Sequence, residues 1–363
     1  MTGNIDASPP DIAAGVVSAA PAGGPPRPSR RRAAQIRDVA RLAGVSHQTV
    51  SRVINGSTHV RPETRARVLT AMDQLDYRAN PVARALTTGR SRTLGVVTFD
   101  VTLFGPASTL HGIERAARDA GYFVSMVGLE SLERAAVITA VERLRGIGVD
   151  GAVVIAPHLP ATTALYDLPQ DVPVVAVEGG PHGIPTVAVD QFHGARLATE
   201  HLLELGHETV HHVAGPDGRE ANLRIDGWRA ALDDAGARVK PFTRGDWSAA
   251  SGYELGREIA ERDDVTAVFV ANDQMAVGVL RALHEHGRTV PDDVSVVGFD
   301  DTPEAGFLIP PLTTVRQDFG EMGRRSLQLL LEAIDSDERL ETRVTIPATL
   351  VTRASTASPR SRA

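Results

Sequence analysis

The sequence predicts a small all-α module followed by a larger α/β body with parallel sheets. Residues 36–75 carry apolar side chains at helical spacing. From residue 93 onward, short runs rich in Val alternate with helical stretches, a pattern typical of parallel sheets covered by helices on both faces. The chain has 363 residues, 42% of them hydrophobic, which is enough for two or three domains with buried cores.

The composition excludes several classes of protein. The chain has no Cys, so disulfides, thiol nucleophiles and cysteine-ligated metal sites are excluded. No apolar run reaches the roughly 18 residues of a membrane span, and we expect no membrane association. Residues 1–33 contain Pro-Pro and Gly-Gly-Pro-Pro but no apolar core of a signal peptide. We therefore expect a disordered tail there, and a cytoplasmic protein.

Charge is distributed unevenly along the chain. The formal net charge is -7, yet residues 34–92 contain ten Arg against four Asp or Glu, a net charge of +6. Residues 1–33 contain four Arg and two Asp, a net charge of +2, so subtracting +6 and +2 from the total of -7 leaves -15 for residues 93–363. Because attraction to phosphates acts over about one Debye length, we expect only the basic N-terminal module to bind a polyanion. A general preference for Arg over Lys explains the residue type but not this separation of sign.

Three short helices are predicted in the basic module. Gly44 permits a tight turn after the first helix, Ser46 can cap the second, and Pro62 suits the first turn of the third. The expected buried positions are Ile36, Val39, Ala40, Ala43, Val50, Val53, Ile54, Val68, Leu69, Met72 and Leu75. The first two helices fit a helix-turn-helix.

The outer face of the second helix carries His47, Gln48, Ser51 and Arg52, and Asn55 follows it. Gln can pair bidentately with adenine and Arg with guanine, and the start of a recognition helix is where side chains reach bases in the major groove. A solvated helix face without a binding role is the alternative, but the basic surroundings favour DNA binding.

Two consecutive stretches, IRDVARLAGVSHQTVSRVING and VRPETRARVLTAMDQLDYRANPVARAL, resemble the DNA-binding headpiece and hinge of the lac repressor family. The resemblance implies that His47, Gln48 and Arg52 read bases. It also implies that the backbone or flanking contacts come from Ser46, Thr49, Ser51, Asn55 and His59.

A hinge helix is expected after the headpiece. Asn80 can cap it and Pro81 can occupy its first turn, but VARAL is too short to be a stable helix alone. The family resemblance implies that the hinge folds on DNA and that Leu86 inserts into the minor groove, where apolar side chains can kink the duplex. A plain linker is the alternative.

Polar residues end several predicted strands of the body. They are Asp100, Glu178, Asn272 with Asp273, and Asp300 with Asp301. In parallel α/β sheets, ligands bind at the carboxyl ends of the strands, so these residues are candidates for a binding site. A helix cap at Asn272 and a turn at Asp300 are the alternatives.

The family resemblance extends to about Arg353 through GDWSAASGYELG, VANDQMAVGVLRAL, NLRIDGW and DVSVVGFDDTPEAGFLIPPLTTVRQDF. It implies two periplasmic-binding-protein-like lobes, joined by three crossings, with a sugar between them. The implied ligand-binding residues are Arg224, Asn272, Asp300 and Gln317 for hydroxyls, Glu178 on the hydroxyl-reading side, Trp247 for the sugar face, and Leu103 and Phe319 for apolar contacts. Planar amides, carboxylates, a guanidinium and an aromatic ring suit a pyranose.

Two positions depart from the family pattern in this pocket. Glu178 replaces an expected Asp, and Val189 replaces an expected aromatic residue. Both changes reshape the hydroxyl-reading side of the pocket. A galactoside is the first expectation for the ligand, and because of these changes a different small glycoside is the second.

These observations predict six segments. They are a disordered tail at 1–33, the headpiece at 34–79, the hinge at 80–92, an N-terminal lobe at 93–189 plus 319–346, a C-terminal lobe at 190–318 plus 347–353, and a disordered tail at 354–363.

The expected function is that of a sugar-responsive repressor that binds a palindromic DNA operator as a homodimer and is released by a saccharide. The member that gives the family its name ends in a leucine-heptad tetramerisation helix, whereas this chain ends TRASTASPRSRA, so we expect dimers. We expect no catalytic residues, cofactor or metal, although His207, His211 and His212 cluster in sequence. A cytoplasmic sugar-binding protein and a sugar-acting enzyme are the alternatives, and neither needs the basic headpiece.

Overall fold

The computed structural model describes residues 34–54, 59–78, 85, 89–129, 131, 133–155, 164–168, 171–336 and 341–360. The chain divides into two compact units between residues 80 and 81. Within the described ranges, no helix combines the length and apolar composition needed to cross a bilayer.

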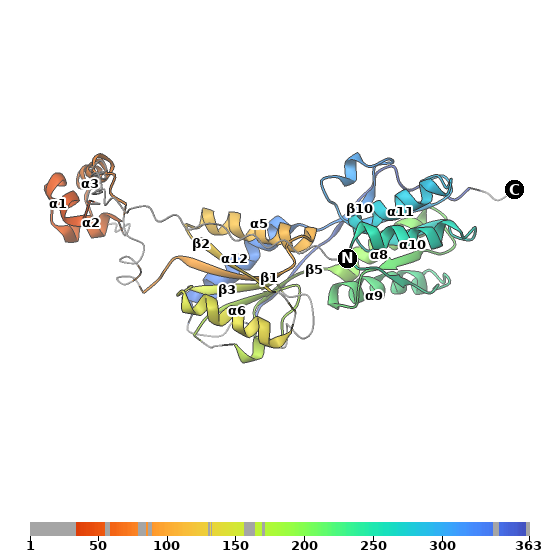
Figure 1. Ribbon diagram of the computed structural model, residues 1–363, viewed down its shortest axis with the longest axis horizontal. Coiled ribbons are helices and arrows are strands. Elements are labelled where there is room, and N and C mark those ends of the chain that lie inside the picture. Colours follow the sequence, from red (N-terminus) through yellow and green to blue (C-terminus); the bar gives the residue numbers. More distant parts are fainter. Residues whose placement is uncertain are drawn as a thin grey trace, which may run out of the picture. The chain divides into compact units, whose positions relative to one another are not determined.

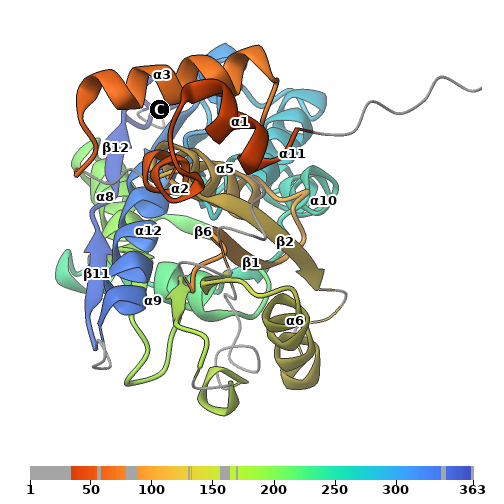
Figure 2. The same cartoon turned by 90° about the vertical axis from the view of Figure 1, so that its left-hand side faces the viewer.

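The N-terminal unit contains α1 (Ile36–Ala43), α2 (His47–Ile54) and α3 (Pro62–Gln74), which pack against one another (Figure 2). Its core consists of Val39, Ala40, Ala43, Val50, Val53, Val68 and Ala71. The expectation that Leu69 is buried was wrong: its exposed fraction is 52%. Ala71 is buried instead, because it lies three residues after Val68 on the inner face of α3.

The connection between α1 and α2 is the predicted tight turn. Gly44 adopts a φ of 64°, and the Val45 amide donates to the Ala40 carbonyl at 3.0 Å. The Ser46 hydroxyl then accepts a hydrogen bond from the Thr49 amide at 3.1 Å, which caps α2. The helix-turn-helix read from the sequence is confirmed.

The first sheet of the body and the helices that cover it form what we call the N lobe. All strands of this sheet are parallel, and their order is β11-β5-β4-β3-β1-β2. Its strands are β1 (Thr93–Phe99), β2 (Phe123–Leu129), β3 (Gly151–Ile155), β4 (Val174–Val177), β5 (Thr186–Val189) and β11 (Arg343–Ile346). One face is covered by α5 (Phe104–Asp119) and α12 (Phe319–Asp335), and the other by α6 (Arg134–Gly146) and the 3-10 helix η1 (Leu165–Asp167) (Figure 1). Covering on both faces explains the continuous apolar runs in β3 and β4.

The second sheet and the helices that cover it form the C lobe. The strand order of this sheet is β12-β10-β9-β8-β6-β7. Its strands are β6 (His211–Ala214), β7 (Thr243–Arg244), β8 (Ala267–Val270), β9 (Ser295–Asp300), β10 (Thr313–Arg316) and β12 (Thr349–Val351), and β12 runs antiparallel to β10. Helices α8 (Gln191–Glu204) and α9 (Arg219–Asp234) cover one face. Helices α10 (Ala249–Ala260) and α11 (Asp273–Glu285) cover the other, and the 3-10 helix η2 (Ala305–Phe307) precedes β10.

The chain crosses between the lobes three times: from β5 to α8, from β10 to α12, and from β11 to β12. Aspartates cap the helices that follow the first two crossings. Asp190 accepts from the His193 amide, and Asp318 accepts from the Glu321 amide, at 2.9 and 2.8 Å. The expected body of two parallel α/β sheets of the periplasmic-binding-protein type is confirmed.

The expectation of a disordered tail from residue 354 was wrong for residues 354–360. Ser355 is fully buried, and its hydroxyl donates to the Val296 carbonyl at 2.6 Å and accepts from the Thr313 amide at 2.8 Å. Arg360 pairs with Asp292 and Asp293. The polar composition of this segment misled the prediction, because its side chains bond to the C lobe rather than to water.

Candidate functional site

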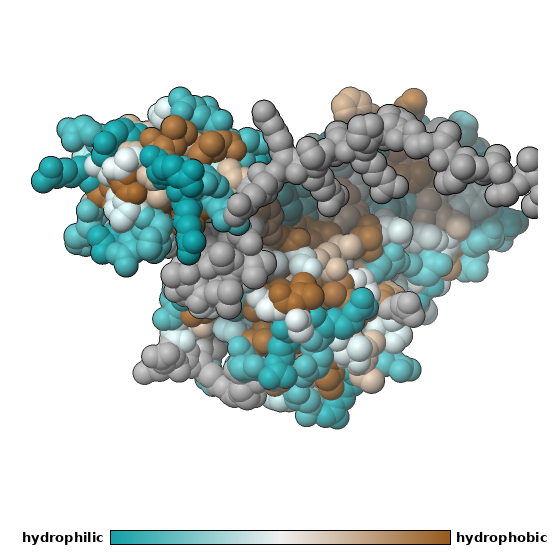
Figure 3. Space-filling model, turned by 60° about the vertical axis from the view of Figure 1, so that its left-hand side comes forward, coloured by the Kyte–Doolittle hydropathy of each residue, from teal (hydrophilic) through white to brown (hydrophobic). Residues whose placement is uncertain are grey.

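The outer face of α2 presents polar side chains on a fixed helix. His47, Gln48 and Arg52 are exposed, and Thr49 and Ser51 are partly exposed, whereas Val50 and Val53 are buried beneath them. Ser46 and His59 are exposed as well, while Asn55 and Leu86 lie outside the described residues. The face of this unit that Figure 3 shows is mostly hydrophilic, with a few apolar residues among the polar ones.

This arrangement suits entry into the major groove. The buried valines hold the helix against the rest of the unit, so its donors and acceptors move as one body. An exposed Gln and an exposed Arg at successive turns can each make bidentate contacts to base edges.

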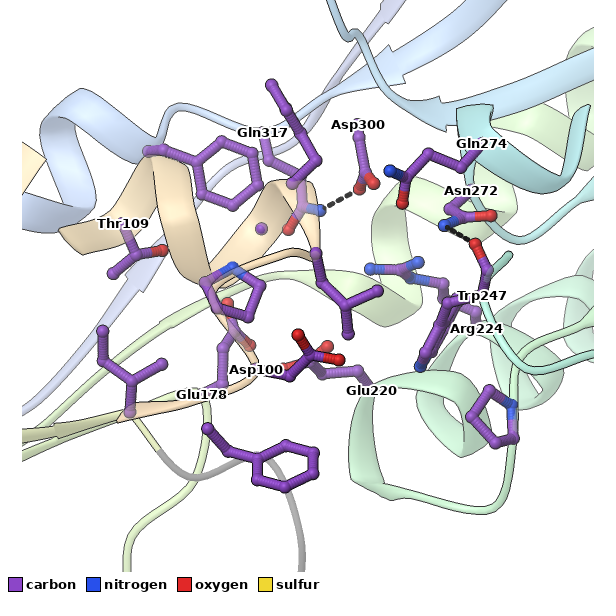
Figure 4. Close-up of a pocket in the computed structure, with 18 of the residues that line it drawn as sticks. Asp100, Thr109, Glu178, Glu220, Arg224, Trp247, Asn272, Gln274, Asp300 and Gln317 are labelled. Atoms are coloured by element: carbon purple, nitrogen blue, oxygen red, sulfur yellow. Dashed lines mark hydrogen bonds between the residues drawn. The ribbon is translucent and has the colours of Figure 1, made fainter. Parts of the chain in front are cut away.

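A second candidate site is a cavity of about 360 Å³ lined by residues of both lobes (Figure 4). This volume lies in the range of small-molecule binding pockets. The lining includes all eight residues that the sequence analysis proposed for the ligand: Leu103, Glu178, Arg224, Trp247, Asn272, Asp300, Gln317 and Phe319. These residues, up to 216 positions apart in the chain, therefore converge on one space.

Strand ends supply much of the polar lining. Asp100 follows β1, Glu178 follows β4, and Asp300 ends β9. All three have positive φ angles, of 40°, 66° and 115°, which non-glycine residues rarely adopt. Such strained backbone is concentrated at functional sites, and here it occurs where these side chains reach the cavity.

The remaining polar residues of these strand ends have structural partners. Asp273 does not line the cavity; it accepts from the Thr302 amide at 2.8 Å and from the Thr314 hydroxyl at 2.6 Å. Asp301 pairs with Arg316 and Arg353. Asn272 both lines the cavity and caps α11, because its side-chain oxygen accepts from the Met275 amide at 2.9 Å.

A hydrogen-bond network centred on Gln191 orients several lining side chains. Arg224 Nε donates to Gln191 Oε1 at 2.8 Å, and Gln191 Nε2 donates to Gln317 Oε1 at 2.9 Å. Gln317 Nε2 in turn donates to Asp300 Oδ1 at 2.6 Å. Gln191 lies at the first lobe crossing and Gln317 at the second, so the network joins the two crossings.

The guanidinium of Arg224 is held by further contacts. Its Nη1 donates to the Ala271 carbonyl, and its Cζ lies 3.9 Å from the centroid of the Phe299 ring. The side chain of Arg224 is therefore fixed from the C lobe before any ligand binds.

Trp247 provides an aromatic surface on the C-lobe side of the cavity. Its ring packs directly on Gly215, where an added Cβ would come within 2.1 Å of the ring. The Trp247 carbonyl accepts from Asn272 Nδ2 at 3.1 Å, and the backbone φ of Trp247 is 75°. A glycine at position 215 is thus required for the observed position of the ring.

The cavity is strongly acidic. Five carboxylates line it, those of Asp100, Glu178, Glu220, Asp246 and Asp300, against the single cation of Arg224. Burial raises the pKa of Asp300 to about 7, although Arg224 opposes the shift. Burial and the neighbouring Glu220 also raise the pKa of Glu178. Three of these carboxylates compete for one guanidinium.

Several residues of the site were not among the proposed ones. They are Phe104, Thr109, Glu220, Asp246 and Gln274, which line the cavity, and Gln191, which orients its lining. Glu220 lies one helical turn before Arg224 on α9, a spacing that places both on one helix face. This spacing in the sequence could have identified Glu220 as a residue of the site once Arg224 was proposed.

Two buried histidines of the C lobe, His207 and His212, have partners within the protein. His212 stacks on Phe269 with ring centroids 4.6 Å apart, and burial lowers its pKa to about 3. His207 contacts the Thr266 hydroxyl and the Ala357 carbonyl, both at 3.0 Å. Across the described ranges, no group of three or more His, Asp or Glu side chains is arranged to hold a metal ion.

Comparisons with known proteins match both units. Residues 35–80 match the model of bacterial regulatory proteins of the lacI family, and residues 199–356 match a periplasmic binding protein-like domain. The lactose operon repressor of Escherichia coli (strain K12) is 36% identical over 339 residues, covering 89% of this chain and 90% of that protein.

Two solved structures are also similar over most of the chain. The lac repressor dimer bound to operator and the anti-inducer ONPF has a TM-score of 0.79 at 35% identity, covering 90% of this chain and 100% of that one. The regulator CelR in complex with cellobiose has a TM-score of 0.66 at 34% identity, covering 89% and 99%. The chain therefore belongs to the lacI family of bacterial regulatory proteins and is a DNA-binding transcriptional regulator with an effector-binding core, not an enzyme.

Proposed function

We propose that the protein is a sugar-responsive repressor that acts in the cytoplasm. A homodimer binds a two-fold symmetric operator through two headpieces, and a small saccharide in the cavity between the lobes releases it. One observation carries this proposal: the cavity brings planar hydrogen-bonding groups and the Trp247 ring together. A pyranose offers matching hydroxyls around its ring plane and an apolar C–H face.

The lobe crossings provide a route from sugar to DNA. Gln317 lines the cavity and lies at one crossing, and it is hydrogen-bonded to Gln191 at another. A saccharide that contacts both lobes changes the relative stability of their arrangements, and residues 80–92 transmit the change to the headpiece. The required coupling between sugar and operator is typically about 1–3 kcal/mol, and linkage demands that operator weaken sugar binding equally.

A galactoside is the first candidate for the effector. The eight proposed ligand residues reach the cavity together, in a chain 36% identical to the lactose operon repressor. Glu178 stands where an Asp was expected and Val189 where an aromatic residue was expected, and both changes reshape the hydroxyl-reading side. A different small glycoside is therefore the second candidate, and the cellobiose bound to the CelR relative is one such molecule.

The test begins with the operator. Binding-site selection from random duplexes with the full-length protein should yield a palindromic sequence, and light scattering of the complex should give two chains per operator. Fluorescence anisotropy then follows release of that duplex by galactosides, glucosides and pentosides. Loss of operator affinity with one of these sugars is the expected result. An operator that none of them releases would refute the sugar response, and a sugar that binds equally well with and without operator would refute the coupling.

A further inference from the structure

The acidity of the cavity bears on what kind of saccharide it takes, an inference that rests on the proposed function. Among the described residues, Glu220 has no hydrogen-bond or ion-pair partner, although it is half-buried at the cavity wall. Asp300 is 8% exposed and accepts a hydrogen bond on Oδ1 alone. Carboxyl oxygens of the C lobe are therefore available to a ligand, and Figure 4 shows Glu220 and Asp300 on either side of Arg224.

Arg224 does not neutralise this set. It is 3% exposed, and its Nε and Nη1 are taken by Gln191 and the Ala271 carbonyl. Its Nη2 has no hydrogen-bond partner in the part of the chain that the structure describes, and the residue lines the cavity. One open donor therefore faces Glu178, Glu220 and Asp300. Burial raises the pKa of each of these carboxyl groups, because a single guanidinium is too little counter-charge to hold all three ionised.

A neutral sugar cannot correct this imbalance. Its hydroxyls can donate to the carboxylates, but they bring no positive charge into a space where water is displaced. A ligand ammonium supplies both the donors and the charge, and charge-assisted hydrogen bonds are shorter and stronger than neutral ones. An anionic sugar would add repulsion to the same site.

We propose that the cavity selects a saccharide that carries a protonated amine, such as a hexosamine, over the neutral sugar with a hydroxyl in the same place. Glu220 receives the ammonium group, Trp247 packs on the apolar face of the ring, and Asp300 and the open Nη2 of Arg224 bind ring hydroxyls. The groups that bind a pyranose are thereby kept, and the amine adds discrimination.

The experiment is a titration calorimetry comparison on the full-length protein at pH 6.5 and at pH 7.5, on either side of the pKa of about 7 to which burial raises Asp300. The probes are galactosamine with galactose, glucosamine with glucose, and N-acetylgalactosamine, whose nitrogen is an uncharged amide. At least one free hexosamine should bind about tenfold or more tightly than its neutral counterpart, the factor expected for one charge-assisted bond. N-acetylgalactosamine should lose that advantage.

A variant pair locates the effect. Glu220→Gln keeps the shape of the side chain and removes its charge, so it should reduce the preference for the amine severalfold. Asp233→Asn removes an exposed charge from the same helix, at its far end, and should leave the preference unchanged. Thermal unfolding of both variants checks that their C lobe is folded. If a variant does not fold, the comparison of hexosamines with neutral sugars on the wild-type protein still tests the proposal.

Two results would overturn the proposal. One is neutral sugars binding as tightly as the hexosamines or more so, and the other is neither hexosamine binding at all. In the first case, a neutral sugar that also releases the operator leaves the proposed repressor function intact. Failure of all sugars to release the operator counts against that function separately.

Discussion

Replacing Gln191 by Leu should destabilise the C lobe and disorganise the cavity. The change keeps the side-chain volume nearly constant, so little of the effect comes from packing. It removes the acceptor of Arg224 Nε at 2.8 Å and the donor to Gln317 at 2.9 Å. The contact to Glu178 Oε2, at 3.4 Å, is long and contributes little.

The magnitude follows from these bonds. A hydrogen bond to a charged group contributes about 1.5–3 kcal/mol and a neutral one about 0.5–1.5 kcal/mol. Arg224 keeps its bond to the Ala271 carbonyl, so the guanidinium is not left wholly unpaired. We therefore expect the free energy of unfolding to fall by about 2–4 kcal/mol.

Urea denaturation followed by tryptophan fluorescence measures this change in the right part of the molecule. The only two tryptophans of the chain, Trp228 and Trp247, both lie in the C lobe. Glu258→Leu is the control, because Glu258 is exposed on α10, in the same lobe as both tryptophans. The control should change stability by less than about 0.5 kcal/mol. An equally small change for Gln191→Leu would refute the view that the network organises the cavity.

Four further outcomes are expected. Arg52→Ala should relax base preference at one position of each operator half-site, measured by binding-site selection, and an unchanged preference would argue against its role in α2. Gly215→Ala should displace the Trp247 ring, because the new Cβ would lie 2.1 Å from it, and should weaken effector binding at least severalfold in calorimetry; Gly146→Ala, which meets nothing within 4 Å, is the control. Asp300 has a folded-state pKa raised to about 7, so the folded chain binds more protons than the unfolded chain between about pH 4 and 7, and this contribution to stability is lost as pH rises through 7. Asp300→Asn should therefore lose less stability than the wild type between pH 5 and 7.5 in urea denaturation, and parallel curves would contradict the shift. Ser355→Ala removes the bonds of its hydroxyl to Val296 and Thr313 and should lower C-lobe stability by about 1–3 kcal/mol; an unaltered melting temperature would show that this hydroxyl does not stabilise the lobe.

Local patterns in the sequence were enough to predict the helix-turn-helix. Val50 and Val53 lie on one face of a single helix and His47, Gln48 and Arg52 on the other, so helical periodicity alone separates buried from exposed positions. The strand-ending residues Asp100, Glu178, Asn272 and Asp300 were predictable for a similar reason. In parallel sheets the carboxyl ends of neighbouring strands meet at one edge, whatever the details of packing.

The positions of Leu69, Gln191, Glu220 and residues 354–360 were decided by tertiary structure. Leu69 has an apolar side chain at a plausible helical position, but α3 packs on the faces of α1 and α2 through Val68 and Ala71 instead. Glu220 and Gln191 look like ordinary helix surface residues until packing within the C lobe brings α8, α9 and β10 together. Ser355 looks solvent-exposed until its hydroxyl meets Val296 and Thr313, which precede it by about 40 to 60 residues.

The sequence by itself determined the two-part architecture, the turn and recognition helix of the headpiece, and the residues that end the body strands, because each follows from periodicity or from a short local motif. Only the tertiary structure decided which polar residues share the cavity. It also decided that three carboxyl groups lie near a single guanidinium and that the C-terminal segment belongs to the C lobe. Those features depend on groups far apart in the chain coming within a few ångströms of one another, and no local pattern encodes such distances.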